Sequence, residues 1–383
     1  MALEDFKCTA CGGSVSFDTD KQKLVCDFCG TEYDIDAPEL HEHDHEGEPH
    51  VHHHSREEVG GEKKVTEVIT DNDGNIWEQE KEFWSDEEED EFKVYSCNSC
   101  GGEIIGDETM AATSCPFCNN NVVIPNQFEG DLRPDFVIPF KLDKEYAKDA
   151  LKKFYSGRKL LPKVFMDQNH INEIKGIYVP FWLYSGTANA DLEFTGTKVR
   201  MYSDSNYNYT ETKYYDINRG GAMDFKFVPV DGSSKIDDIL MESIEPYKWE
   251  EATGFTSQYL AGFLANRYDM EAKDCIENAE KRIKNSTIET FKNSVSGYDS
   301  VSLKRTEYQL GKVNINYALA PVWFLNTEWN GKFYTFAMNG QTGKIIGDDM
   351  PIDKGIMMRK WLTVGAIVAV IIFIIAIMVF RFL

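Results

Sequence analysis

The chain has 383 residues, with 64 acidic and 40 basic side chains, and its formal net charge is −24 at pH 7. A surface of this sign repels nucleic acid and anionic lipid, because affinity for phosphates rests on lysine and arginine. The charge therefore argues against general nucleic-acid binding, and it favours protein partners with basic or mixed surfaces.

The most informative pattern is a repeat of cysteine knuckles. Eight of the nine cysteines form four Cys-x-x-Cys pairs, and these pairs form one unit that occurs twice with an offset of 89 residues. In each unit, fourteen residues separate the two pairs. The first unit consists of Cys8, Cys11, Cys26 and Cys29, and the second of Cys97, Cys100, Cys115 and Cys118.

Four thiolates in two knuckles are what a tetrahedral Zn²⁺ requires, and they leave no open position for water or substrate. Fourteen residues are enough for a short hairpin that brings the second knuckle back to the first. Gly12 and Gly13 follow the first knuckle, as a glycine pair does in the copy, and glycine permits backbone conformations that larger residues resist. The repeat predicts two zinc ribbons, at residues 1–35 and 94–124, each with one structural Zn²⁺.

A redox dithiol is the alternative, since a single Cys-x-x-Cys pair occurs in both kinds of site. Four knuckles in matched pairs favour zinc. The span from Cys8 to Cys29 is 22 residues, too few to bury a core, so the metal must stabilise the fold, by about 10–16 kcal/mol per site in model peptides. Disulfides are not expected in a reducing compartment. Cys275 has no cysteine neighbour and is interpreted as a small buried apolar residue.

Residues 36–93 are predicted to be an acidic, histidine-rich linker. From Asp34 to Glu91 there are 22 acidic and 4 basic residues, and the first part is almost without apolar side chains, as in disordered segments. Seven of the eight histidines lie there: His41, His43, His45, His50, His52, His53 and His54. This tract is a candidate for weak metal binding, and a merely polar tract is the favoured interpretation. The turn at residues 71–74 (Asp-Asn-Asp-Gly) between two apolar runs predicts a short hairpin.

Residues 125–352 have the composition of one α+β domain, with strand-rich halves around a helical insert. We expect a strand at 136–140 and a helix from Asp143 to Ser156, with an N-terminal cap and a glycine after its end. A β-rich stretch begins near residue 177. The remaining expectations are helices at 257–267 and 271–293 and strands at 312–319, 321–325 and 332–337. Pro-x-Trp occurs at 180–182 and again at 321–323, a second internal repeat.

Motifs of catalysis are not found in the sequence. It has no phosphate-binding Walker loop, no dinucleotide fingerprint and no nucleophile elbow. The segment from Asp231 to Lys235 resembles a phosphate loop only in composition and is interpreted as a turn. His170, the one histidine outside the linker, is interpreted as a loop residue. We therefore expect no enzymatic activity.

Residues 353–383 are predicted to be a transmembrane tail anchor. The twenty residues 361–380 carry no charge, and as a helix they would be about 30 Å long, which matches the hydrocarbon core of a bilayer. Thirteen of them are Leu, Ile, Val or Phe. At about −0.3 to −0.6 kcal/mol each, these contribute roughly −4 to −8 kcal/mol to insertion.

The charges that flank this span predict its orientation. Lys354, Arg359 and Lys360 precede the span, whereas only Arg381 follows it. By the positive-inside rule the large N-terminal part stays in the cytoplasm. The first five residues lack the basic and apolar pattern of a signal peptide. The expected location is therefore the cell membrane, with a single pass.

Three segments beside the ribbons carry a resemblance to a known family: residues 179–182 (Val-Pro-Phe-Trp), 321–323 (Pro-Val-Trp) and 338–344 (Met-Asn-Gly-Gln-Thr-Gly-Lys). With the paired ribbons, they resemble a bacterial family of membrane-anchored double zinc-ribbon proteins, which are labelled TFIIB-type zinc ribbon-containing or primosomal helicase-like. The chain has no helicase domain, so the second label is rejected. The resemblance implies a scaffold, with phage-shock-protein-A-like or SPFH-like membrane-stress proteins as candidate partners.

Three functions remain open from the sequence. The leading hypothesis is a membrane-anchored adaptor whose ribbons dock protein partners, with Phe28, Tyr33 and Phe117 expected at the ribbon surfaces. A nucleic-acid-binding regulator is the second, but between their outer cysteines the first ribbon has only Lys21 and Lys23, and the second has no Lys or Arg. A membrane-tethered zinc sensor or an enzyme of unknown activity is the third.

Overall fold

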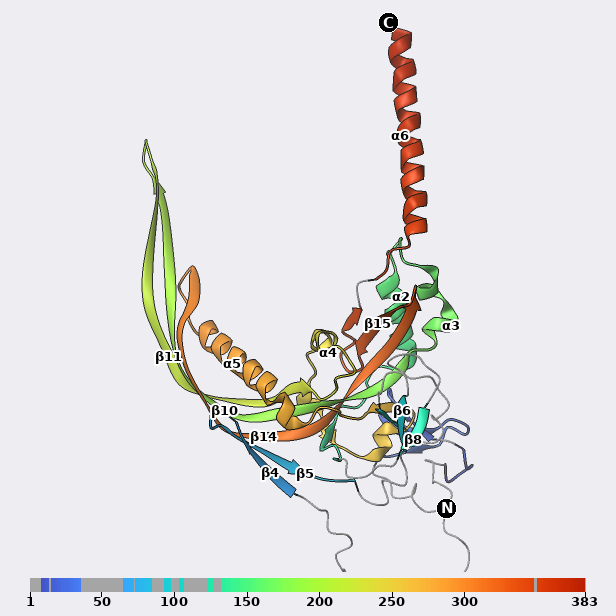
Figure 1. The fold of residues 1–383 in the computed structure, drawn as a ribbon, viewed down its shortest axis with the longest axis vertical. Helices are drawn as coiled ribbons and strands as arrows, with labels where there is room; N and C mark the ends of the chain where they lie inside the picture. The colour runs from blue at the N-terminus through green and yellow to red at the C-terminus, as the bar shows by residue number, and fades with distance from the viewer. Residues whose placement is uncertain are drawn as a thin grey trace, which may run out of the picture.

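The computed structural model describes residues 8–13, 15–35, 65–71, 73–84, 93–97, 103–106, 123–126, 132–347 and 350–382. Within these ranges the chain contains both helices and sheets. A three-stranded sheet lies near the N-terminus, and a thirteen-stranded sheet forms the body. One long helix, α6 (Lys354–Phe382), projects from this body (Figure 1).

Three very long strands organise the large sheet: β10 (Lys175–Ser203), β11 (Asn208–Asp231) and β14 (Ser300–Trp329). The middle strand, β10, is antiparallel to both of the others. The two Pro-x-Trp segments lie side by side in this sheet, because Tyr178 pairs with Pro321 and Trp182 with Tyr317. The second internal repeat of the sequence is thus a pair of neighbouring strands.

Both faces of the sheet are buried where β10 and β14 pair. On β10, Tyr178, Trp182 and Tyr184 enter one core cluster, whereas the alternate residues Val179 and Phe181 enter another. Side chains of a strand alternate between the two faces, so a strand covered on both sides reads as a continuous apolar run. This arrangement explains the unbroken apolar segments at residues 177–184 and 317–325.

Shorter strands add to the long ones at successive points along their length. For example, β14 pairs in turn with β5 (Ile76–Lys81), β9 (Phe136–Val137) and β15 (Lys332–Asn339). The other strands of the body are β4 (Val65–Thr70), β6 (Lys93–Cys97), β7 (Glu103–Gly106), β8 (Val123–Asn126), β12 (Thr253–Gly254), β13 (Leu264–Asn266) and β16 (Ile345–Gly347). The hairpin predicted in the linker is confirmed as β4 and β5, and it belongs to the body sheet.

Helix α2 (Lys144–Tyr155) begins and ends where the sequence predicts, whereas the helix expected at 271–293 begins at Ile276, after a 3-10 segment. In α2, the Asp143 carboxylate accepts the Tyr146 N–H, and Gly157 follows with a φ of 81°. The other helices of the body are α3 (Gln168–Ile171), α4 (Asp238–Ile244) and α5 (Ile276–Asn293). Short 3-10 segments are found at Lys163–Met166, Trp249–Glu251, Ser257–Leu260 and Ala272–Cys275.

The hairpin of β10 and β11 extends from the body as a long curved arm (Figure 1). The strands change register on both sides of Gly186. A side chain there would meet the Lys312 carbonyl oxygen at 2.7 Å, so glycine lets the two backbones approach at this bend. Helix α5 packs along the arm, where Ile288 and Phe291 lie against a small core that includes Leu192 and Phe194.

Three expectations need correction. The helix at 257–267 is wrong, because a 3-10 turn ends near Leu260, Gly262 adopts a φ of 81°, and β13 follows. The strands expected at 312–319 and 321–325 form one continuous strand. Proline has no N–H to donate, but the Pro321 carbonyl still accepts a hydrogen bond from the Gly340 N–H, so the strand continues through it. The strand at 136–140 is only two residues long.

Several predicted features lie outside the described residues. They are the seven histidines of the linker and, in the second cysteine unit, Cys100, Cys115, Cys118 and Phe117. The backbone of Cys97 is described, as the last residue of β6.

Candidate metal centre

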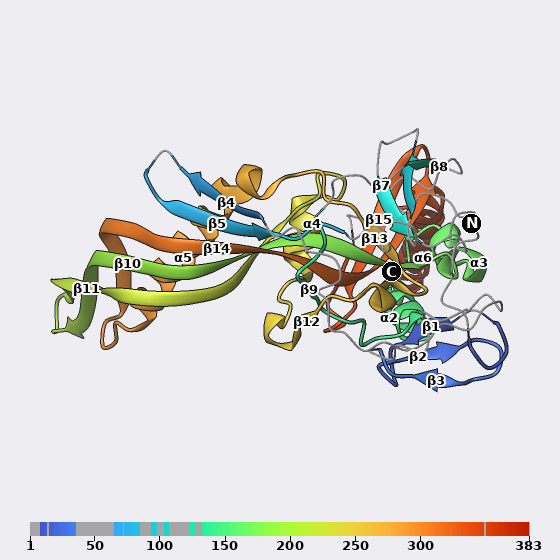
Figure 2. The same ribbon diagram turned by 90° about the horizontal axis from the view of Figure 1, so that it is seen from below.

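The first cysteine unit folds as a small antiparallel sheet of β1 (Val15–Asp18), β2 (Lys23–Cys26) and β3 (Glu32–Tyr33) (Figure 2). The turn between β1 and β2 is held by the Asp18 carboxylate, which accepts the N–H groups of Asp20 and Lys21. Val15 pairs with Cys26, so the hairpin brings the second knuckle back beside the first. This is the hairpin that the fourteen-residue spacing predicts.

The two knuckles have the same backbone geometry. In the first, the Gly12 N–H donates to the Cys8 carbonyl across 2.7 Å, and in the second the Gly30 N–H donates to the Cys26 carbonyl across 3.0 Å. Gly12 and Gly30 have φ values of 71° and 73°, which side chains disfavour. Each turn therefore depends on its glycine, and each directs two sulfurs toward the same point.

The four sulfurs of Cys8, Cys11, Cys26 and Cys29 lie within 4.8 Å of one another. Two of the sulfur pairs, Cys8 with Cys29 and Cys11 with Cys26, are separated by 3.5 Å. A tetrahedral site with metal–sulfur bonds of about 2.3 Å places its sulfurs about 3.8 Å apart. All four are free thiols, and their separations fit one ion held by four sulfurs. The structure thus brings the four predicted ligands together in a cluster that can hold a metal ion.

Hydroxyl groups around the cluster stabilise thiolates. The Tyr33 hydroxyl lies 3.0 Å from the Cys8 sulfur and lowers the pKa of Cys8 to about 6, against the effect of burial. The Thr31 hydroxyl lies 3.0 Å from the Cys29 sulfur and, with the Thr31 N–H, lowers the pKa of Cys29. Hydrogen bonds to the charged form favour that form, so these partners prepare two of the four sulfurs for a cation.

Cys11 shows the cost of placing sulfurs this close without a cation. The Gly13 N–H lowers the pKa of Cys11, but the nearby sulfurs of Cys26 and Cys29 raise it more, and it reaches about 12. Four sulfurs this close cannot all become thiolates in isolation, because like charges oppose one another. A divalent ion at their centre removes this opposition, which couples metal binding to proton release.

The aromatic residues of the unit differ from expectation in one case. Phe28 is 76% exposed, as predicted, with its ring against Gly13. Tyr33 was expected at the surface, but it is only 6% exposed. The prediction for Tyr33 is wrong because its hydroxyl bonds to the Cys8 sulfur and its ring packs in the small core. Hydrogen bonding to a sulfur is the role that the sequence did not reveal.

The unit is docked on the body. The Phe17 ring meets the Tyr259 ring edge-on at 5.5 Å, and the Phe17 N–H donates to the Ala261 carbonyl across 3.1 Å. The Gln22 amide donates to the Phe140 carbonyl across 2.8 Å. These contacts fix the cysteine cluster relative to the large sheet.

The remaining candidate residues have structural roles. Cys275 is fully buried and burial raises its pKa to about 12, as expected for an inert thiol. His170 lies in α3, not in a loop, and its ring contacts the Thr327 hydroxyl at 2.6 Å and Glu173 at 2.9 Å. The Asp231 carboxylate accepts the Ser233 N–H in a turn, and burial raises its pKa well above the usual value.

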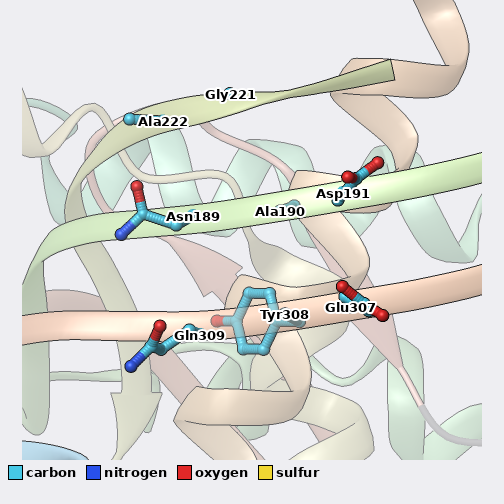
Figure 3. A pocket seen from close by; sticks show the side chains of 8 residues that line it. All are labelled: Asn189, Ala190, Asp191, Gly221, Ala222, Glu307, Tyr308 and Gln309. Carbon is cyan, nitrogen blue, oxygen red and sulfur yellow. The ribbon is translucent and has the colours of Figure 1, made fainter. Parts of the chain in front are cut away.

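A shallow hollow of about 560 Å³ lies on the arm, across β10, β11 and β14 (Figure 3). Its lining is made of amide, carboxyl and small side chains with one phenol: Asn189, Ala190, Asp191, Gly221, Ala222, Glu307, Tyr308 and Gln309. Asp191 and Glu307 are direct neighbours across the strands. This lining contains no cysteine, histidine or serine that could act as a nucleophile.

Comparison with known proteins finds one relative, described as the uncharacterized protein YdjG of Bacillus subtilis strain 168. The two sequences are 34% identical over 233 residues, which is 61% of this chain and 68% of the relative. No family model matches the chain. No solved structure matches it.

The Tyr33–Cys8 hydrogen bond yields a test of the metal centre. We expect Tyr33→Phe to weaken Zn²⁺ binding at this unit by about tenfold, because partners that bond to the ligands typically contribute 10–100-fold to affinity. Competition with a chromogenic chelator measures the change, and Tyr214→Phe, at an exposed position on the arm, is the control. Unchanged affinity in Tyr33→Phe would show that the hydroxyl does not support the ligand.

Proposed function

This chain belongs to the same family as YdjG of Bacillus subtilis, and we propose that it is a membrane-anchored adaptor without enzymatic activity. In this proposal α6 spans the cell membrane, two zinc-stabilised ribbons present docking surfaces, and the body connects the two. The resemblance noted in the sequence adds phage-shock-protein-A-like and SPFH-like proteins as candidate partners, with a role in membrane stress.

The observation that carries the proposal is the exposure of α6. Within the described chain, α6 is the helix that is long and apolar enough to cross a membrane, and none of its apolar window is buried. Trp361 is 71% exposed, and Leu362 and Phe373 are 67% and 66% exposed. A helix that is apolar on all sides is stable only where its surroundings are apolar. A bilayer supplies that environment around the full circumference.

The base of α6 is joined directly to the body. The Asp353 carboxylate accepts the N–H groups of Gly355 and Ile356, and the Asp353 N–H donates to the Leu160 carbonyl. The Lys360 ammonium donates to the Lys159 carbonyl. A membrane-embedded α6 therefore holds the body close to the bilayer, and the basic residues at its start favour the cytoplasmic side.

We assign zinc to the first unit on its ligand set. Four sulfurs in a tetrahedral arrangement are typical of zinc, whereas calcium and magnesium take oxygen ligands. Four protein ligands complete the tetrahedron, so the role of the ion is structural. The second unit has the same spacing, and we extend the assignment to it, which gives two Zn²⁺ ions per chain.

The first ribbon favours a protein partner over nucleic acid. The two lysines between its outer cysteines are paired with acids, Lys21 with Glu32 at 2.7 Å and Lys23 with Asp34 at 2.9 Å. Paired lysines contribute little to phosphate binding, which depends on free positive charge. Phe28 instead offers an exposed apolar side chain on a rigid turn, and aromatic side chains of this kind are typical anchors of protein interfaces.

Metal content tests the zinc assignment. We expect two Zn²⁺ ions per purified chain, and one after Cys26→Ser, because the two units bind independently in the proposal. Elemental analysis of the protein measures this. A matched Cys275→Ser variant should keep both ions, since its thiol is buried and is not part of the cysteine cluster in the described chain. A content near zero, or one ion in the unaltered chain, would contradict the assignment.

Extraction from membranes tests the anchor. We expect the full chain to resist alkaline carbonate extraction, because about twenty apolar residues in the bilayer make insertion effectively irreversible. A variant that ends after Asp353 should move to the extracted fraction and remain folded, since its core lies in the body. Full resistance of the shortened variant would show that another part of the chain anchors it.

Affinity capture from membrane-stressed bacteria tests docking. We expect Phe28→Ser to lose membrane-associated partners while it keeps both zinc ions, because the side chain is exposed and holds no ligand. The combined Cys8→Ser and Cys97→Ser variant should lose the same partners through loss of the ribbons. Tyr214→Ser is the control for an exposed aromatic elsewhere. Recovery of nuclease-sensitive material would favour the nucleic-acid alternative, and unchanged partners would place docking on the body.

A further inference from the structure

The end of the arm extends beyond the rest of the large sheet. The pairing of β10 with β14 stops at Thr197 and Ser300, whereas the pairing of β10 with β11 continues to Ser203 and Asn208. Residues 198–213, which we call the tip segment, thus form a two-stranded hairpin with both faces open. Nearly all of its side chains are exposed. Isolated two-stranded hairpins are marginally stable in water, so this segment gains from an additional contact.

The tip segment exposes large apolar and aromatic side chains. Met201 is 78% exposed, Tyr207 67% and Tyr202 50%. The rings of Tyr202 and Tyr209 stack across the two strands with their centroids 5.1 Å apart. Tyrosine has an apolar body and a polar hydroxyl, and it is enriched where a bilayer meets water.

The charge of the tip segment differs from that of the chain. Its charged residues are three basic and two acidic ones: Lys198, Arg200, Lys213, Asp204 and Glu211. The tip segment therefore has a net charge of +1, whereas the whole chain carries −24. The Arg200 guanidinium lies 5.5 Å from the centre of the Tyr202 ring. Basic residues beside aromatic ones suit lipid headgroups, and this part of the surface lacks the negative charge that repels anionic lipid.

The turn at the end of the tip segment has a defined shape. The Asp204 carboxylate accepts the N–H groups of Asn206 and Tyr207, and it accepts the Tyr209 hydroxyl across 3.0 Å. These bonds lower the pKa of Asp204. The turn therefore holds the tyrosines in place before any contact is made, which reduces the entropy cost of binding.

The arm and α6 extend to the same side of the body (Figure 1). The tip segment passes the level at which α6 begins, and the view from below places the arm and α6 at opposite ends of the molecule (Figure 2). On α6, Trp361 lies seven residues after Lys354, about 10 Å along the helix. A membrane surface at the level of Trp361 can therefore be contacted by the tip segment.

We propose that the tip segment is a second membrane contact, which inserts its tyrosines and Met201 into the headgroup region of the bilayer leaflet that α6 enters. This inference rests on the proposed membrane span of α6 and goes beyond it, since it assigns a function to the arm. The lipid surface is the occupant that the geometry favours, because α6 places a bilayer on this side of the body. Two contacts at opposite ends of the molecule fix the orientation of the body relative to the membrane.

Photolabelling of the full chain in liposomes tests the inference. The liposomes contain phosphatidylcholine, phosphatidylglycerol and a phosphatidylcholine with a diazirine near its headgroup. Trypsin then separates three informative peptides: residues 201–213 from the tip segment, 214–219 from the arm just behind it, and 361–381 from α6. We expect lipid adducts on 201–213 at several-fold the level per residue on 214–219, although Tyr214 in the second peptide is 72% exposed.

A matched pair of variants completes the experiment. Replacing Met201, Tyr202 and Tyr207 together with serine should reduce the adducts on the tip peptide several-fold and leave those on 361–381 unchanged. Serine at Tyr214 should leave both peptides as they are. Adducts on 361–381 without adducts on 201–213 overturn this inference and leave the anchor intact, whereas absence of adducts from 361–381 overturns the anchor itself. Covalent links between tip peptides of two chains, in place of lipid, would make this surface a self-association site.

Discussion

The antiparallel pairing of β10 with β14 is the interaction on which the rest of the structure depends. It runs from Lys175 opposite Phe324 to Thr197 opposite Ser300, and it joins segments more than a hundred residues apart in the sequence. Nearly every other element of the body attaches to one of these two strands or to a neighbour of them. Bringing together segments so far apart in the sequence costs conformational entropy of the chain, and burial of the continuous apolar faces of both strands offsets that cost.

The first ribbon and the body combine two sources of stability. The body has a core on each face of its sheet, whereas the ribbon has only a few buried side chains around its four sulfurs, among them Val15, Phe17 and Leu24. Because Phe17 also contacts Tyr259 and Ala261, the small core of the ribbon continues into that of the body. The cysteine cluster is therefore held from two directions, by its own knuckles and by the surface beneath it.

The parts of the structure that sequence predicted are those with local causes. The cysteine spacing predicted the cluster, Asp143 and Gly157 predicted the ends of α2, and the turn at 71–74 predicted the hairpin of β4 and β5. The α+β class and the exposed apolar helix near the C-terminus were also predictable. In each case a few neighbouring residues determine the conformation.

The parts that the sequence did not reveal depend on distant partners. Leu264 to Asn266 resembled the end of a helix, but pairing with Ile177 and Tyr178 makes it a strand. Tyr33 resembled a surface aromatic residue, yet its hydroxyl bonds to a sulfur 25 residues earlier in the chain. The length of the arm was equally hidden, because Tyr- and Thr-rich segments indicate strands without showing how far their pairing continues.

Because the arm is long, a small change of angle at Gly186 produces a large displacement at its end. Seventeen residues separate Gly186 from Ser203 along β10, and a strand rises about 3.3 Å per residue, so the end of the arm lies up to about 56 Å from the bend. A rotation of about 5° at Gly186 displaces that end by about 5 Å over such a length. The Lys312 carbonyl leaves no room for a side chain at this pivot. The position of the end of the arm thus depends on how tightly the strands pack around Gly186, and on β14 and α5, which continue along the arm beyond it.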